Sequence, residues 1–138
     1  MCIRDSDRAY PWVDTGNGRF TVGICMDLND DGFTGWIQQQ NPDVVAFPTN
    51  WVDTGESVWP YWAFRMQGSR AALVAANRYG SESLAGAEAI GPTDEERGIT
   101  RFSGASCVLQ WRSHEGELRP TVLASLPTVG DGGVAVPV

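Results

Sequence analysis

The chain has 138 residues and a mass of 15.0 kDa, which is enough for one domain with a hydrophobic core and too short for two ordinary ones. Hydrophobic residues make up 42% and charged residues 20%, and no run approaches the roughly 18 consecutive apolar residues that a membrane-spanning helix needs. All ten basic residues are arginines, and the formal net charge of -7 argues against a nucleic-acid-binding surface.

The first six residues, MCIRDS, are typical of translated adaptor or assembly sequence, and we exclude residues 1–6 from the fold prediction. They are polar and lack the apolar core of a secretory signal. The cysteines form no CxxC pair, which argues against a structural zinc site or a disulfide framework. We therefore expect a cytoplasmic chain without cofactor or metal, in which residues 7–138 belong to one domain.

Strands and helices are predicted to alternate along the first half of the chain. Three apolar runs have the composition of strands: 19–28, 43–48 and 71–76. Two intervening segments have apolar residues at helical spacing: 33–40 and 58–67. Ser57 is the predicted cap of the second helix, and Pro60 falls in its first turn.

The second half is predicted to end in a hairpin. Residues 77–100 are polar and are predicted to form a long loop. Two strands follow, at 102–111 and 118–125, with a turn at 114–117 between them. The order of elements indicates an α/β fold with helices packed on a sheet.

Cys25 has the clearest chemical signature. It ends the first predicted strand, directly before a turn and a helix, and many hydrolases present a nucleophile at such a turn because backbone N–H groups there face the substrate. Asp27 is suited to hold this turn by accepting hydrogen bonds from its amides. The alternative is that Cys25 is an inert apolar residue, which is the common role of a single cysteine.

His114, the one histidine, offers a rival arrangement. A Cys25–His114 dyad of the papain type would need no other catalytic side chain. The chain lacks the local papain motif, and His114 falls in a predicted turn, so we disfavour this dyad. Cys107 alternates inward on a predicted strand and is assigned to the core.

Four segments resemble the nitrilase, or carbon–nitrogen hydrolase, superfamily in order and spacing. GICMDLN at 23–29 is similar to the family's nucleophile motif, Gly-x-x-Cys-x-Asp, and RPTVLASLP at the end of the predicted hairpin is similar to its closing segment. The other three segments are FPTNW at 47–51, LVAANRYG at 73–80 and RFSGASCVL at 101–109. The resemblance covers most of the chain.

The resemblance implies an α-β-β-α sandwich and hydrolysis of a non-peptide amide, carbamoyl or nitrile C–N bond. It makes Cys25 the nucleophile, with the backbone N–H of Met26 as an oxyanion donor, beside a Lys and a Glu that act as cation and general base. Asn50 and Trp51 would bind substrate. The supporting residues would be Asp27, Asn77 and Arg78.

The chain departs from the family pattern because it contains no Lys and no Glu before Cys25. Asp5, Asp7 and Asp14 are the carboxylates there, and none lies on a predicted strand. We therefore expect a C-terminal portion of a carbon–nitrogen hydrolase, incomplete at the N-terminus and inactive alone. An acyltransferase of the same fold and a non-catalytic relative are the alternatives.

The resemblance also suggests partners. The Cys-Met-Asp string is similar to the corresponding turn of amidases that act on N-terminal Asn and Gln, which favours a small amide substrate over a nitrile. Family members commonly form homo-oligomers.

Overall fold

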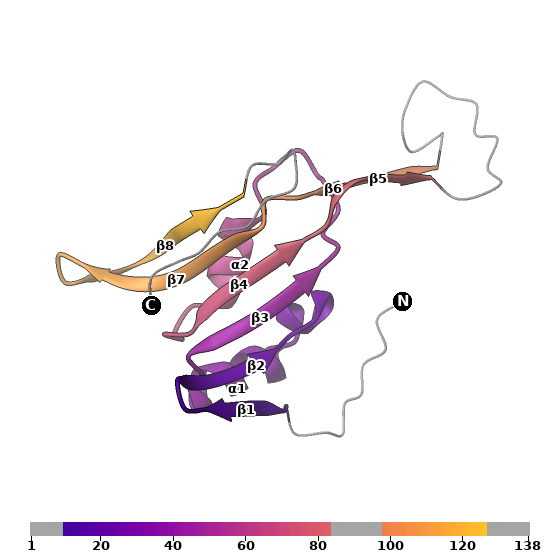
Figure 1. Ribbon diagram of the computed structural model, residues 1–138. Helices are drawn as coiled ribbons and strands as arrows, with labels where there is room; N and C mark the ends of the chain where they lie inside the picture. The colour runs from indigo at the N-terminus through magenta and orange to yellow at the C-terminus, as the bar shows by residue number, and fades with distance from the viewer. Residues whose placement is uncertain (1–9, 84–97, 127–138) are drawn as a thin grey trace.

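The computed structural model describes residues 10–83 and 98–126 (Figure 1). Residues 1–6, assigned above to adaptor sequence, lie outside these ranges. The elements in chain order are β1 (Trp12–Thr15), β2 (Gly18–Val22), the 3-10 helix η1 (Cys25–Asn29), α1 (Asp31–Gln40), β3 (Val44–Thr49), α2 (Trp59–Arg65), β4 (Ala72–Asn77), β5 (Tyr79–Ser83), β6 (Ile99–Ser103), β7 (Cys107–His114) and β8 (Glu117–Ser125).

Six strands form one mixed sheet in the order β1-β2-β3-β4-β7-β8. The central strands β2, β3 and β4 are parallel, and these are the three strands predicted in the first half of the chain. β1, β7 and β8 each run antiparallel to their neighbours, and Pro120 of the edge strand β8 lies opposite Trp111. β5 and β6 form a separate two-stranded ribbon that extends beyond the carboxyl end of β4 (Figure 1).

Both α-helices cover one face of this sheet, and in Figure 1 they lie behind it. Alternate residues of β3 and β4 point into the core between sheet and helices, because side chains of a strand face opposite sides in turn. The largest fully buried side chains there include Phe33 and Ile37 of α1, Trp62 of α2, Phe47 of β3 and Leu73 of β4. The α/β prediction and the apolar faces assigned to the two helices are therefore confirmed.

The opposite face of the sheet is apolar and open. Val22 is 50% exposed and Val74 is 38% exposed, although both belong to the parallel centre of the sheet. Phe20 and Pro48 are also exposed on strands of this centre. The described residues thus form one sheet with one helical layer, the α-β half of the expected sandwich.

The first predicted strand is shorter than its apolar run. β2 ends at Val22, and residues 25–29 form η1 instead of extending the strand. Helix α1 begins at Asp31, where the carboxylate of Asp30 accepts a hydrogen bond from the amide of Gly32 and caps the helix. Apolar composition predicted burial here correctly, but the backbone turns away from the sheet before Cys25.

Other boundaries were wrong for identifiable reasons. The run 102–111 is divided into β6 and β7 because Gly104 and Ala105 adopt positive φ angles of 62° and 56°. The predicted loop 77–100 begins with β5, which pairs with β6. Ser57 does not cap α2, whose N-terminal cap position is Val58 without a side-chain hydrogen bond. β1 was not predicted, because its four residues are exposed and have no apolar alternation.

Candidate active site

The candidate site lies where the parallel strands end. Because β2, β3 and β4 run in the same direction, the segments that follow their carboxyl ends meet at one edge of the sheet, which is where open α/β sheets bind ligands. The residues predicted for the site follow these strands: Cys25 and Met26 after β2, Asn50 and Trp51 after β3, and Asn77 with Arg78 at the end of β4.

Cys25 occupies a strained turn. It is the first residue of η1, its φ angle is +49°, and its free thiol is half-buried. A non-glycine residue in the left-handed region is uncommon and persists only where the surroundings enforce it. Gly23 permits the approach to this turn, because a Cβ atom there would overlap the ring of Phe33.

Asp27 holds the turn from inside. Its carboxylate Oδ2 accepts a hydrogen bond of 2.7 Å from the backbone N–H of Ile24, and its own N–H donates to the carbonyl of Ile24 at 3.0 Å. The N–H of Gly23 donates to the carbonyl of Ala46 at 3.0 Å, which fixes the turn to β3. This is the geometry expected of a supporting residue, and the role of Asp27 in catalysis stays a prediction.

Asn77 is the centre of a buried polar network. Its Oδ1 accepts a hydrogen bond of 2.8 Å from the N–H of Trp51, and its Nδ2 donates to the hydroxyl of Ser103 at 2.7 Å and to the carbonyl of Gly104 at 2.6 Å. The backbone N–H of Asn77 donates to the hydroxyl of Ser106 at 2.9 Å. One side chain thereby joins the segments that follow β3, β4 and β6.

The two residues predicted to bind substrate lie in different surroundings. The ring of Trp51 is half-buried and packs against Tyr61 at 5.5 Å and Trp62 at 6.0 Å between centroids, so it closes the core beneath the site. Asn50 is exposed directly before it. Contact of either side chain with a substrate stays a prediction.

Arg78 makes the ion pair that the sequence favoured. Its guanidinium contacts the carboxylate of Glu82 within β5, and it also lies over the ring of Phe102 at 4.4 Å from the centroid. Its backbone N–H donates to the carbonyl of Thr49 at 3.0 Å. Arg78 therefore attaches the ribbon to the end of the sheet.

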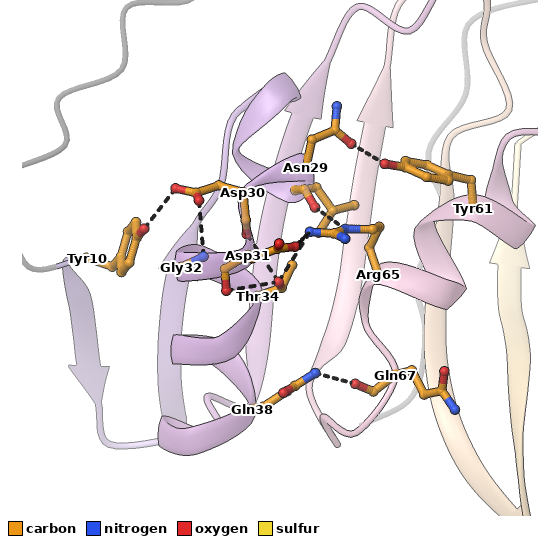
Figure 2. A network of polar contacts seen from close by, with 11 residues as sticks. Tyr10, Asn29, Asp30, Asp31, Gly32, Thr34, Gln38, Tyr61, Arg65 and Gln67 are labelled. Carbon is orange, nitrogen blue, oxygen red and sulfur yellow. Dashed lines mark hydrogen bonds and ion pairs between the residues drawn. The ribbon is translucent and has the colours of Figure 1, made fainter.

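Arg65 was placed in a resembling helix but was not predicted to belong to the site. From α2, its guanidinium reaches the segment between η1 and α1 (Figure 2). Its Nε donates to the carbonyl of Leu28 at 2.8 Å, and its Nη2 contacts the carboxylate of Asp31 at 2.7 Å. Tyr61 of the same helix donates its hydroxyl hydrogen to the side chain of Asn29. No periodicity or spacing indicated these contacts, because they join residues more than 30 positions apart.

The structure contradicts the rival dyad of Cys25 and His114. β7 runs antiparallel to β4 and ends at His114, so this histidine lies at the edge of the sheet opposite to the carboxyl ends of the parallel strands (Figure 1). Asp14 is also at that opposite edge, because it pairs with Arg19 near the start of β2. Asp14 does lie on a strand, contrary to expectation, but not near Cys25.

Cys107 has the opposite environment to Cys25. It is buried at the start of β7, opposite Ala75, and desolvation raises the pKa of its thiol from 9.0 to about 11. Within residues 10–83 and 98–126, no group of three or more potential metal ligands is found, and no helix has the length and hydropathy needed to cross a membrane.

Comparison with known proteins supports the fold. No protein-family model and no curated protein sequence matches the chain. Among solved structures, an amidase of the nitrilase superfamily from Nesterenkonia AN1 is similar with a TM-score of 0.61 and 17% identity, over 90% of this chain and 39% of the other. A carbon–nitrogen hydrolase from Helicobacter pylori G27 is similar with a TM-score of 0.60 and 21% identity, over 91% and 42%.

A third similar structure is Nit3 of Saccharomyces cerevisiae, of the nitrilase superfamily, with a TM-score of 0.52 and 17% identity. It shares 75% of this chain and 34% of its own length. The chain thus has the fold of the carbon–nitrogen hydrolases, as the four motifs predicted, and it spans about two fifths of the length of the first two structures.

Proposed function

We propose that this chain is part of a carbon–nitrogen hydrolase that cleaves a small amide, with Cys25 as the nucleophile. The observation that carries the proposal is the backbone of Cys25, which has a φ angle of +49° in a turn at the carboxyl edge of three parallel strands. Strain of this kind at a ligand-binding edge is a mark of functional residues, and it presents the side chain to the site.

The chemistry follows from a thiolate. The sulfur of Cys25 attacks the carbonyl carbon of the amide, and the resulting oxyanion is stabilised by the backbone N–H of Met26. The tetrahedral intermediate expels the amine, which takes up a proton, and leaves a thioester. Water then attacks the thioester, releasing the carboxylic acid and restoring the thiol. Two steps replace one difficult step.

The chain does not contain every group that this reaction needs. The sequence has no Lys and no Glu before Cys25, and the structure places Asp14 and His114 at the wrong edge. We assign the general base and the cation to polypeptide outside these 138 residues. The 138-residue chain alone is therefore expected to be inactive on amides, since loss of a single oxyanion donor costs about 100- to 1000-fold in rate.

The other site residues have supporting roles in this proposal. Asn50 and Trp51 line the substrate side, Asn77 holds their loop, and Arg78 holds the ribbon. The side-chain amide of an Asn or Gln is the favoured substrate class, in a cytoplasmic enzyme that forms homo-oligomers and needs no cofactor. In crystals of the Nesterenkonia amidase, acrylamide is joined by Michael addition to the active site cysteine, which shows that a site of this fold directs an amide to its thiol.

Acrylamide addition tests the nucleophile in this chain. The rate at which Cys25 of the native chain adds acrylamide is compared with the rate for the same residue in the chain unfolded in urea, using peptide mapping by mass spectrometry. We expect faster addition in the native chain, because backbone donors surround the thiol. A native rate equal to or below the unfolded rate would contradict the proposal.

The reading frame upstream of residue 7 tests the assignment of the missing groups. A Lys and two Glu on predicted strands there support an enzyme. Their absence favours a non-catalytic relative of the same fold.

A further inference from the structure

We propose that Arg65 is a positioning residue that holds the turn of Cys25 in its strained conformation. This inference rests on the proposed function, because it concerns the same thiol. It extends that function by assigning the control of the turn to α2, an element that contributes no predicted site residue.

The contacts of Arg65 converge on the segment directly after Cys25. Its Nε donates a hydrogen bond of 2.8 Å to the carbonyl oxygen of Leu28, the fourth residue of η1. Its Nη2 contacts Oδ1 of Asp31 at 2.7 Å and Oγ1 of Thr34 at 3.4 Å, both in α1. Figure 2 shows the guanidinium extending from α2 to this junction. One planar group therefore fixes the end of η1 relative to the start of α1.

The bond to Leu28 matters more than the ion pair. The side chain of Asp31 is 94% exposed, and an ion pair with so exposed a partner contributes little. The side chain of Arg65 is only 16% exposed and Leu28 is fully buried. A carbonyl near the end of a short helix has no partner within the helix, so a charged donor in a buried setting stabilises it substantially.

The turn needs such support because its own bonds are few. The N–H of Asp27 donates to the carbonyl of Ile24, and the N–H of Asp30 donates to the carbonyl of Asp27. Short 3-10 segments have poor hydrogen-bond geometry, and a non-glycine residue at positive φ adds strain. Arg65 supplies an anchor at the carboxyl end of η1, while Asp27 supplies one at its start.

Four variants of the 138-residue chain test the proposal. Arg65→Met removes both contacts and keeps an apolar stem. Arg65→Lys keeps charge and stem without the planar fork, and it serves if Arg65→Met does not fold. Asp31→Asn weakens the ion pair alone. Arg70→Met is the matched control, because Arg70 is exposed and bonds Asn41 and Gln110 through its backbone.

Two quantities are measured on dilute protein. Hydrogen exchange at the amides of Ile24 and Asp27 reports the turn, and exchange at Val45 in β3 reports global opening. The rate of acrylamide addition to Cys25, relative to the urea-unfolded chain, reports the thiol. A purely structural role for Arg65 would lower the protection of all three amides together.

We expect Arg65→Met and Arg65→Lys to lower protection at Ile24 and Asp27 relative to Val45 by about tenfold, and to bring the addition rate of Cys25 toward the unfolded value. Asp31→Asn and Arg70→Met should change neither quantity by more than about twofold.

Three outcomes would overturn the inference: equal loss of protection at Val45, equal effects of Asp31→Asn and Arg65→Met, or a changed turn with an unchanged Cys25 rate. The failure of the proposed function is distinguishable, because it appears in the unsubstituted chain as a Cys25 that reacts no faster than when unfolded.

Discussion

The turn after β2 and the first residues of β7 each contain a cysteine, and the two regions treat the same side chain in opposite ways. Cys107 lies in a regular strand opposite Ala75, and burial raises the pKa of its thiol to about 11. Cys25 lies outside any strand, half-buried, with its backbone in the left-handed region. The backbone position and not the residue type decides which thiol can serve as a nucleophile.

Alkylation should separate the two thiols most strongly. At about pH 8, a thiol with a pKa near 11 has roughly a hundredfold less thiolate than a thiol with an ordinary pKa. We expect iodoacetamide to label Cys25 in preference to Cys107 by about this factor, measured by peptide mapping. Equal labelling, or faster labelling of Cys107, would remove the distinction between the two regions.

Alkaline pH should reveal the burial of Cys107 as lost stability. The folded-state pKa of about 11 lies above the model value of 9.0, so the contribution of the protonated thiol is complete below pH 9 and disappears as the pH rises toward 11. The free energy of unfolding should fall by about 2 to 3 kcal/mol over this range from Cys107 alone.

Cys107→Ala is the control for this loss. Tyrosines also titrate at alkaline pH, so the difference between the two chains isolates the contribution of Cys107. The unfolding curve of the variant should lose about 2 to 3 kcal/mol less between pH 9 and 11. Parallel pH profiles of the two chains would show that the thiol is not desolvated.

A pair of glycine substitutions tests the packing beneath the turn of Cys25. Gly23→Ala should lower the free energy of unfolding by about 1 to 3 kcal/mol, because the added methyl group overlaps the ring of Phe33. Gly35→Ala, in the interior of α1 with no neighbour within 4 Å, should raise it by about 0.5 to 1 kcal/mol. Urea denaturation measures both, and effects of the same sign would contradict this packing.

The smallest effect is expected at the opposite edge of the sheet. His114→Ala should change the free energy of unfolding by less than about 0.5 kcal/mol, because the side chain is exposed. The rate of Cys25 alkylation should also be unchanged from about pH 5 to 8, the range in which histidines commonly titrate. A pH profile that changes in this variant would revive the Cys25–His114 dyad.

The sequence predicted the parallel centre of the fold well because local signals agree there. Continuous apolar runs in β3 and β4 and helical spacing in α1 and α2 each lead to the observed element. Prediction failed where backbone dihedrals decide. Nothing in the letters Gly-Ala-Ser at 104–106 reveals two consecutive positive φ angles, and these divide the predicted strand into β6 and β7.

The candidate site divides in the same way. Cys25 and Asp27 could be selected because they are close in sequence and share a motif. The contact between Arg65 and Leu28 joins residues 37 positions apart, and the role of Trp51 as a lid on the core depends on Tyr61 and Trp62. Such contacts follow from tertiary packing, which periodicity does not encode.

Pro120 limits how this sheet can meet another polypeptide. It lies within the edge strand β8 and has no backbone N–H, so a strand from another chain that approached this edge would find a break in the row of donors. The apolar face that includes Val22 and Val74 has no such safeguard. Self-association of the chain should therefore proceed by stacking of faces, not by growth of a continuous sheet.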